Sequence, residues 1–340
     1  MTDVIVADES GAELRSILYK KFDFEVGDNE NTFLITCNRA EWASVPDNGR
    51  VYISGTEYGG IYKRLESDTR NGTAAIGGFT WRGMLQNKCI VPPSGQDYAV
   101  DTGELNAIIR ERVTAAYPHL FAGVSESTGI TVNFQYARYT SLYDGLKAML
   151  QSAGYKMQLS YDQTINKVIV SAVPIVDYSP MIEYSSDMNA DYKMVLDRTG
   201  VNHMICLGQG ELKDRTVVHL YMDENGNVSQ TQTYFDEDEI VEVYDYAGAS
   251  EADLIQSGTQ RMQSNASRNE FSITLDTVQD VAVGDIVGAR DYDTGMTMTA
   301  PIVTKIYQWQ DGFEKTEYKL SKDVNVEQSN TLLSASEETT

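Results

Sequence analysis

Short β-rich runs separated by turn signals recur at even spacing through the first hundred residues, and they constrain the fold more than any other feature. The turns between them include the stretches 46–49 (PDNG) and 70–72 (RNG). Such spacing is typical of a small barrel or sandwich. A Pro/Gly break at 91–96 marks a boundary, so we expect residues 1–95 to form a first tube-like β-barrel domain. The predicted strands are Lys20–Val26, Thr32–Cys37, Arg50–Ser54, Gly59–Leu65 and Thr73–Arg82.

Two helix signals follow this break. Asp101 with Glu104 fits a capping arrangement ahead of an apolar stripe, and Pro118 should stop that helix. A second helix should begin near Thr140 or Ser141 and end at Gly154, where a left-handed cap residue belongs. Two alternating strands should follow up to residue 170. Residues 96–180 are therefore predicted to form an α+β insert, a small helix-strand domain.

Strand patterns return after residue 180, and the turn Asp223–Asn227 predicts a hairpin. One helix should be capped by Ser250 and Asp253. We expect residues 181–325 to form a second β-barrel domain with one helix, in a chain that is mainly β with α+β inserts. Residues 326–340 are rich in Ser, Thr and Glu and are predicted to form a mobile C-terminal tail. The predicted strands of this part are Val201–Leu207, Arg215–Met222, Val228–Phe235, Ile240–Tyr246, Glu270–Leu275, Ile286–Arg290, Ala300–Gln310 and Phe313–Leu320.

Net charge is the strongest signal in the composition. The chain carries 27 Lys and Arg against 50 Asp and Glu, a formal charge of −23. Such a chain repels the phosphate backbone, which argues against tight nucleic-acid binding. The acidity serves solubility, or it forms a surface past which another polyanion moves without sticking, and charge alone does not choose between these. The 21 tyrosines suit half-buried strands and subunit interfaces.

Targeting signals and redox chemistry add little. No apolar run reaches the length that spans a bilayer, and the N-terminus lacks the apolar segment of a signal peptide. We therefore expect synthesis in the cytoplasm and no membrane insertion. Cys37, Cys89 and Cys206 are odd in number and far apart, so neither a disulfide framework nor a zinc site is predicted.

No recognisable catalytic constellation stands in the sequence. His119, His203 and His219 have no partner at the helical spacing of metal ligands, and core or surface roles are favoured for all three. Neither a nucleophile elbow nor a phosphate-binding Walker loop occurs. We therefore predict a protein that is not an enzyme, with no catalytic, cofactor-binding or metal residue and no cofactor.

Four weaker features are explained by ordinary structural roles or lack support. Asp223–Asn227 superficially resembles a calcium loop, but its glycine stands at the fourth position, which favours a hairpin turn. The acidic run 236–239 is read as a solvated loop. Trp42, Trp81 and Trp309 are scattered and favour core positions over a carbohydrate platform. A carboxylate pair for glycoside cleavage has no specific support.

One stretch resembles a known family. Thr199–Tyr221, followed by Asp223–Gly226, resembles the core signature of siphophage tail-hub or tail-associated proteins. Gly83–Ile90 and Val283–Val287 are weaker matches to the same family. The resemblance implies the fold of the baseplate hub of contractile phages, in which two tube-like β-barrels with small α+β inserts form a trimer. Six barrels around one axis then match a sixfold tail tube.

The resemblance also implies partners and a place in the virion. A homotrimer at the tail tip would contact tail tube and distal tail proteins, the tape measure protein and a tip fibre or spike. Many family members carry a long C-terminal extension, which this sequence lacks, so a pure adaptor is expected. An acidic lumen would keep exiting DNA from adhering. The alternatives are a tail-tip cell-wall hydrolase, a carbohydrate-binding receptor module, or the same hub in a phage-derived contractile particle.

Overall fold

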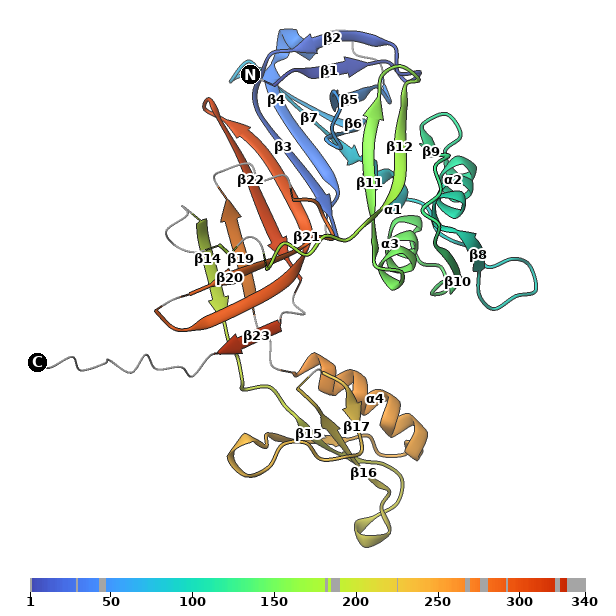
Figure 1. The fold of residues 1–340 in the computed structure, drawn as a ribbon, viewed down its shortest axis with the longest axis vertical. Helices are drawn as coiled ribbons and strands as arrows, with labels where there is room; N and C mark the ends of the chain where they lie inside the picture. The colour runs from blue at the N-terminus through green and yellow to red at the C-terminus, as the bar shows by residue number, and fades with distance from the viewer. Residues whose placement is uncertain are drawn as a thin grey trace, which may run out of the picture. The chain divides into compact units, whose positions relative to one another are not determined.

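The chain divides into two compact units (Figure 1). The computed structural model describes residues 2–28, 30–42, 47–180, 183–184, 190–224, 226–266, 270–275, 281–291, 293–321 and 325–328. Unit 1 comprises Met1–Tyr192 with Ser272–Thr340, and unit 2 comprises Lys193–Phe271. The division into residues 1–95, 96–180 and 181–325 stays a prediction.

Unit 1 is built on a large sheet whose strands come from both ends of the chain. Two short strands, β20 (Ile286–Arg290) and β23 (Asn325–Gln328), pair with β21 beside the main path, and β13 (Glu183–Tyr184) pairs with β20. The order along the path is β14 (Ala190–Val195), β19 (Glu270–Leu275), β22 (Phe313–Leu320), β21 (Met296–Gln310), β3 (Tyr19–Gly27), β4 (Thr32–Asn38), β7 (Thr73–Thr80), β6 (Gly59–Asp68), β5 (Arg50–Ile53), β1 (Val4–Ala7) and β2 (Glu13–Ile17).

N-terminal and C-terminal strands pair within one sheet, and this pairing determines the architecture. β3 pairs antiparallel with β21, with Phe22 opposite Trp309, and Figure 1 shows the two strands side by side. The prediction of a mainly β chain is confirmed. Among the described residues, however, no sheet closes into a barrel. Because strands assigned to two separate barrels share one sheet, the predicted two-barrel architecture is not confirmed.

An α+β region follows the first strands, as predicted. β8 (Val100–Glu104) pairs with β10 (Thr131–Gln135), while β12 (Lys167–Pro174) lies between β11 (Tyr155–Asp162) and β9 (Phe121–Gly123). The helices α2 (Leu105–Ala116) and α3 (Leu142–Ser152) pack against these strands. We call this part, residues 100–174, the insert.

The helix ends show which local signals were read correctly. Ser141 caps α3, accepting from the backbone N–H of Asp144 at 3.0 Å, as predicted. The start of α2 differs: Glu104 is its cap, accepting from Ala107 N at 2.9 Å, and Asp101 lies in β8. A short helix, α1 (Trp81–Gln86), was missed, because Thr80 ends β7 and caps α1 where a continuing strand was predicted.

The insert shares one hydrophobic core with the neighbouring strands and α1. Trp81 is 1% exposed, and its ring stacks on Tyr161 of β11 at 5.4 Å. Gly59 of β6 leaves room for that ring, since a Cβ there would lie 2.7 Å from the indole. On the other strands of the sheet, Phe24 stacks on Phe33 with ring centroids 5.6 Å apart. A 3-10 turn, η1 (Arg39–Trp42), buries Trp42.

Unit 2 is a four-stranded sheet with one helix. The strand order is β17 (Val228–Ser229), β16 (Val217–Met222), β15 (His203–Leu207) and β18 (Val241–Asp245). α4 (Glu251–Ser264) begins at the predicted capping box of Ser250 and Asp253. Two short turns, η3 (Leu212–Asp214) and η4 (Asp236–Asp238), connect the strands. The predicted strand Val228–Phe235 is shorter than expected and ends at Ser229.

The predicted tail falls only partly within the described chain. Residues 325–328 form β23, which pairs with β21 through Val326 and Met298. Residues 329–340 lie outside the described residues, so their predicted mobility stays a prediction.

Candidate interaction surface

A groove of about 490 Å³ crosses the outer face of the unit 1 sheet. The sheet register brings its central residues together, since Leu34 of β4 lies opposite both Asp23 of β3 and Gly77 of β7. The groove is lined by Asp23, Glu25, Glu30, Thr32, Phe33, Leu34, Lys63, Arg64, Gly77, Gly78 and Phe79.

Gly77 keeps the floor of the groove open. A Cβ at this position would lie 3.3 Å from the Phe33 carbonyl oxygen, a tight contact that the backbone of β4 would relieve by shifting a few tenths of an ångström, and 3.7 Å from Leu34 Cδ1. Gly78 differs, because a Cβ there would lie 2.0 Å from the carbonyl oxygen of Ile61. Glycine within a strand often marks a place where another backbone approaches closely. Gly77 fits that role on the groove side.

A β-bulge places two basic residues at the rim. The register between β6 and β7 shifts between Tyr62 and Arg64, so Lys63 is an extra residue on β6. An extra residue breaks the strict alternation of faces and re-aims the side chains beside it. Lys63 and Arg64 consequently both line the groove.

The groove is charged at both ends and apolar between them. Asp23 and Glu25 lie on β3, which two strands, β4 and β7, separate from the basic residues of β6. Leu34 and Phe79, on the strands between, are 42% and 37% exposed. The Arg64–Glu66 pair at 3.2 Å is exposed on both sides and contributes little to stability. Such a surface suits a protein partner that carries both charges around an apolar centre.

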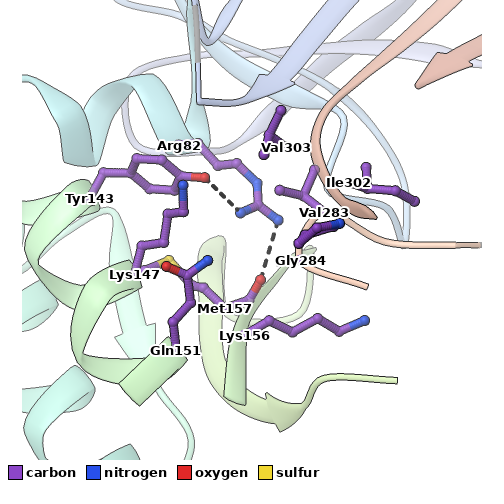
Figure 2. A pocket seen from close by; sticks show the side chains of 11 residues that line it. Arg82, Tyr143, Lys147, Gln151, Lys156, Met157, Val283, Gly284, Ile302 and Val303 are labelled. Atoms are coloured by element: carbon purple, nitrogen blue, oxygen red, sulfur yellow. Dashed lines mark hydrogen bonds between the residues drawn. The ribbon is translucent and has the colours of Figure 1, made fainter. Parts of the chain in front are cut away.

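The buried guanidinium of Arg82 in unit 1 forms a network of internal hydrogen bonds. The Arg82 guanidinium donates to Glu57 Oε2 from Nε at 3.0 Å and from Nη2 at 2.8 Å. It also donates to the Tyr143 hydroxyl at 3.4 Å and to the Met157 carbonyl at 3.3 Å (Figure 2). Burial works against the charged form of Arg82, but the Glu57 carboxylate and Tyr143 outweigh it and raise the pKa of Arg82.

The pocket around Arg82 is too small for a substrate. Its volume is about 20 Å³, which admits a single water molecule. Lys147 and Lys156, which line it, form ion pairs with Asp28 and Asp285 respectively. Because these pairs join the insert to the strands and turns of the large sheet, we assign this charge cluster to holding unit 1 together.

The structure brings two of the three histidines together, which sequence reasoning missed. His203 Nε2 lies 2.9 Å from His219 Nδ1, and His203 Nδ1 lies 2.6 Å from Glu239 Oε1. The search for helical spacing could not find this pair, because it spans two antiparallel strands. The usable signal was the placing of both histidines in neighbouring predicted strands. His119 is exposed in unit 1.

The other sequence features fall where they were expected. Asp223–Asn227 closes the hairpin between β16 and β17, and Asp223 N donates to Asn227 O at 2.9 Å. Residues 236–238 are exposed on η4, whereas Glu239 beside it is half-buried and contacts His203. Cys37 and Cys206 are buried and Cys89 is exposed, all three as free thiols. Burial raises the pKa of the Cys37 thiol to about 11.

Trp309 is half-buried and packs edge-on against Tyr19 at 5.0 Å, while Trp42 and Trp81 are buried.

No group of three or more His, Cys, Asp or Glu side chains within the described ranges could hold a metal ion. In the same part of the chain, no helix combines the length and the apolar character needed to cross a membrane.

Comparisons with known proteins find the fold in phage tails. No protein-family model matches the chain, and no curated protein matches its sequence. A tail protein from Neisseria meningitidis MC58 aligns with 93% of this chain and 96% of its own, at a TM-score of 0.50 and 14% identity. The 43 kDa tail protein of prophage MuSo2 from Shewanella oneidensis aligns with 94% of this chain and 98% of its own, at a TM-score of 0.52 and 10% identity.

A chain of the phage P2 baseplate, in its activated conformation with Ca, covers 95% of this chain and 99% of its own, with a TM-score of 0.52 and 11% identity. The sequence identities are low, so the likeness concerns the fold. It extends over nearly the whole of each chain. This protein therefore has the fold of phage tail and baseplate proteins.

Proposed function

We propose that this chain is a structural hub protein of the tail tip or baseplate of a long-tailed bacteriophage. The observation that carries the proposal is the shared fold, which spans 93–95% of this chain and nearly the full length of each tail protein. A match of that extent favours the role of a whole tail subunit over that of a small domain attached to an unrelated enzyme. In this role the chain forms a trimeric ring that closes the tail tube.

Surfaces of unit 1 support assembly with further subunits. The groove on its sheet has an apolar centre between opposite charges. At one end of the sheet, β2 pairs with β1 alone among the described strands, so its outer edge is open to another strand. Leu14 and Leu18, in and beside β2, are 48% and 65% exposed. In the proposed ring, neighbouring copies cover these surfaces, and the tube-like barrels of the hub are completed between subunits.

The charge suits a channel for DNA. Each chain carries −23, and a ring of three concentrates that charge around one axis. An acidic lumen repels DNA within about 10 Å at 0.1 M salt, which lets DNA pass without adhering. The proposed partners are the tail tube and distal tail proteins, the tape measure protein and a tip fibre or spike. The role requires no catalysis and no cofactor, and nothing in the described residues favours a hydrolase or a glycan-binding module.

Immunogold electron microscopy of purified tails tests the proposal. Antibody against this chain should label one end of each tail, with the head-proximal end and the shaft unlabelled. Antibody against a major tube protein is the control, because it should label along the shaft. Labelling along the shaft, or recovery of the chain only in the tail-free fraction, would overturn the proposed location.

A further inference from the structure

Two histidines share the uncovered face of the unit 2 sheet. β15 and β16 are antiparallel, with His203 opposite Tyr221 and Ile205 opposite His219. Since successive strand residues alternate between faces, these four lie on one side of the sheet. The residues between them, such as Met204 and Leu220, point to the other face, where they share the core beneath α4.

His203 is held in one tautomer by its surroundings. The ring is 7% exposed, and the Tyr221 ring stacks on it at 4.3 Å. Its Nδ1 lies 2.6 Å from Glu239 Oε1, and Gln232 Nε2 donates to the same oxygen at 3.0 Å. A carboxylate only accepts hydrogen bonds, so Nδ1 carries the proton. The Nε2 lone pair of the neutral ring is therefore free to act as an acceptor.

The Nε2 atom of His203 faces a ring nitrogen of the neighbouring histidine, His219. His219 Nδ1 lies 2.9 Å from His203 Nε2. Because the Nδ1 proton of His203 is directed at Glu239, the neutral pair places the shared hydrogen on His219 Nδ1. The His219 ring is exposed, so it can turn and shift its proton to Nε2 without a change in charge. Both ring nitrogens, 2.9 Å apart on one side of the sheet, then carry a lone pair.

We propose that His203 Nε2 and His219 Nδ1 chelate one divalent transition-metal ion, with Zn²⁺, Ni²⁺ and Cu²⁺ as the fitting class. Metal–nitrogen bonds of about 2.0–2.1 Å at the right angle of tetragonal Ni²⁺ or Cu²⁺ place two nitrogens about 2.9 Å apart, which is the separation observed here. The wider tetrahedral angle of Zn²⁺ places them about 3.3–3.4 Å apart, so the exposed His219 ring has to shift by a few tenths of an ångström to bind Zn²⁺. Imidazole suits these ions, whereas Mg²⁺ and Ca²⁺ prefer oxygen. The arrangement goes beyond the proposed tail role.

Glu239 acts as a positioning residue in this site. Metal-binding histidines commonly donate their other ring N–H to a carboxylate, which fixes the ring and makes it a better ligand. The Glu239–His203 contact has that form without a metal bound. Because no third His, Cys, Asp or Glu in the described part of the chain joins the pair, water fills the remaining positions. A two-imidazole site of this kind should bind in the micromolar range.

Calorimetric titration of the full-length chain tests the site, with ZnCl₂ added to protein stripped by a chelator. We expect one Zn²⁺ per chain. His219→Ala should weaken binding at least tenfold, because only one imidazole remains, and it should stay folded because the ring is exposed. Glu239→Gln should weaken binding by about 10–100-fold. His119→Ala, an exposed histidine of unit 1, is the matched control and should bind as the wild type does.

Electron paramagnetic resonance with CuCl₂ gives a readout of the ligands themselves. The wild type should show two imidazole nitrogens bound to copper, and His219→Ala should show one. Excess MgCl₂ should not compete, whereas ions held loosely by the acidic surface would be displaced. Absence of stoichiometric binding, equal binding by His219→Ala, or displacement by Mg²⁺ would overturn the proposal.

Discussion

Unit 1 and unit 2 reach a buried core by different means. In unit 1, one described cluster of 26 buried side chains joins strands of the large sheet to the insert, and it includes Trp81, Phe121 and several tyrosines. In unit 2 the corresponding cluster has eight buried side chains, none of them aromatic, beneath a single helix. A large core spreads its stability over many contacts, whereas a small one depends on each contact. Core substitutions in unit 1 should therefore lower the free energy of unfolding by more. In unit 2 the loss should be smaller, but it should be a larger fraction of that unit's own stability.

The largest expected effect is at Trp81. Trp81→Ala removes a fully buried indole that stacks on Tyr161, so unfolding should become easier by about 3–5 kcal/mol. Hydrogen exchange measured by mass spectrometry should show faster exchange across the insert and α1 and no change in unit 2. Trp309→Ala serves as the control, because removing its half-buried ring should lower the free energy of unfolding by less. Equal losses for both variants would contradict the central place of Trp81 in the core that the insert shares with the sheet.

The buried ion pair comes next. Glu57→Leu leaves the Arg82 guanidinium, 4% exposed, without its carboxylate, and should destabilise unit 1 by about 3 kcal/mol in denaturant unfolding. The double variant Glu57→Leu with Arg82→Met removes both charges and should recover a large part of that loss. If the double variant were as unstable as the single one, the cost would come from lost packing and not from an unpaired charge.

A smaller effect is expected in the core of unit 2. A Cβ at Gly258 of α4 would lie 2.6 Å from Cys206 Sγ and 2.7 Å from Leu220 Cδ1. Gly258→Leu should therefore push α4 off its sheet, at about 1–3 kcal/mol, and raise hydrogen exchange throughout unit 2. Gln256→Ala, on the exposed side of the same helix, should change little. Protection retained in β15 and β16 of Gly258→Leu would show that α4 contributes less to this core than the packing implies.

Local signals predicted local structure well in both units. The start of α3 near Ser141 and the cap of α4 at Ser250 were predicted correctly, because a side-chain oxygen beside free backbone N–H groups acts within one turn. The hairpin at 223–227 was predicted for the same reason. The helix α1 was missed because its few residues continue a strand-like, glycine-containing run, and only Thr80 marks its start.

The pairing of distant segments could not be read in this way. β3 and β21 pair although 268 residues of chain lie between Gly27 and Met296, and no periodicity records which strands become neighbours. The groove depends on that order of strands and on a bulge at Lys63, and the His203–His219 contact depends on the register between β15 and β16. The resemblance led to phage tail proteins, whose fold the structural comparisons find, but the two barrels that it implied are not confirmed.

The mass of the purified chain in solution tests the central claim most directly. Light scattering at near-physiological salt, over a range of protein concentrations, distinguishes a ring from a single chain of 37.8 kDa. The proposed hub predicts a trimer of about 113 kDa, three times the mass of the chain. A mass of 37.8 kDa at every concentration would contradict a self-assembling trimeric hub.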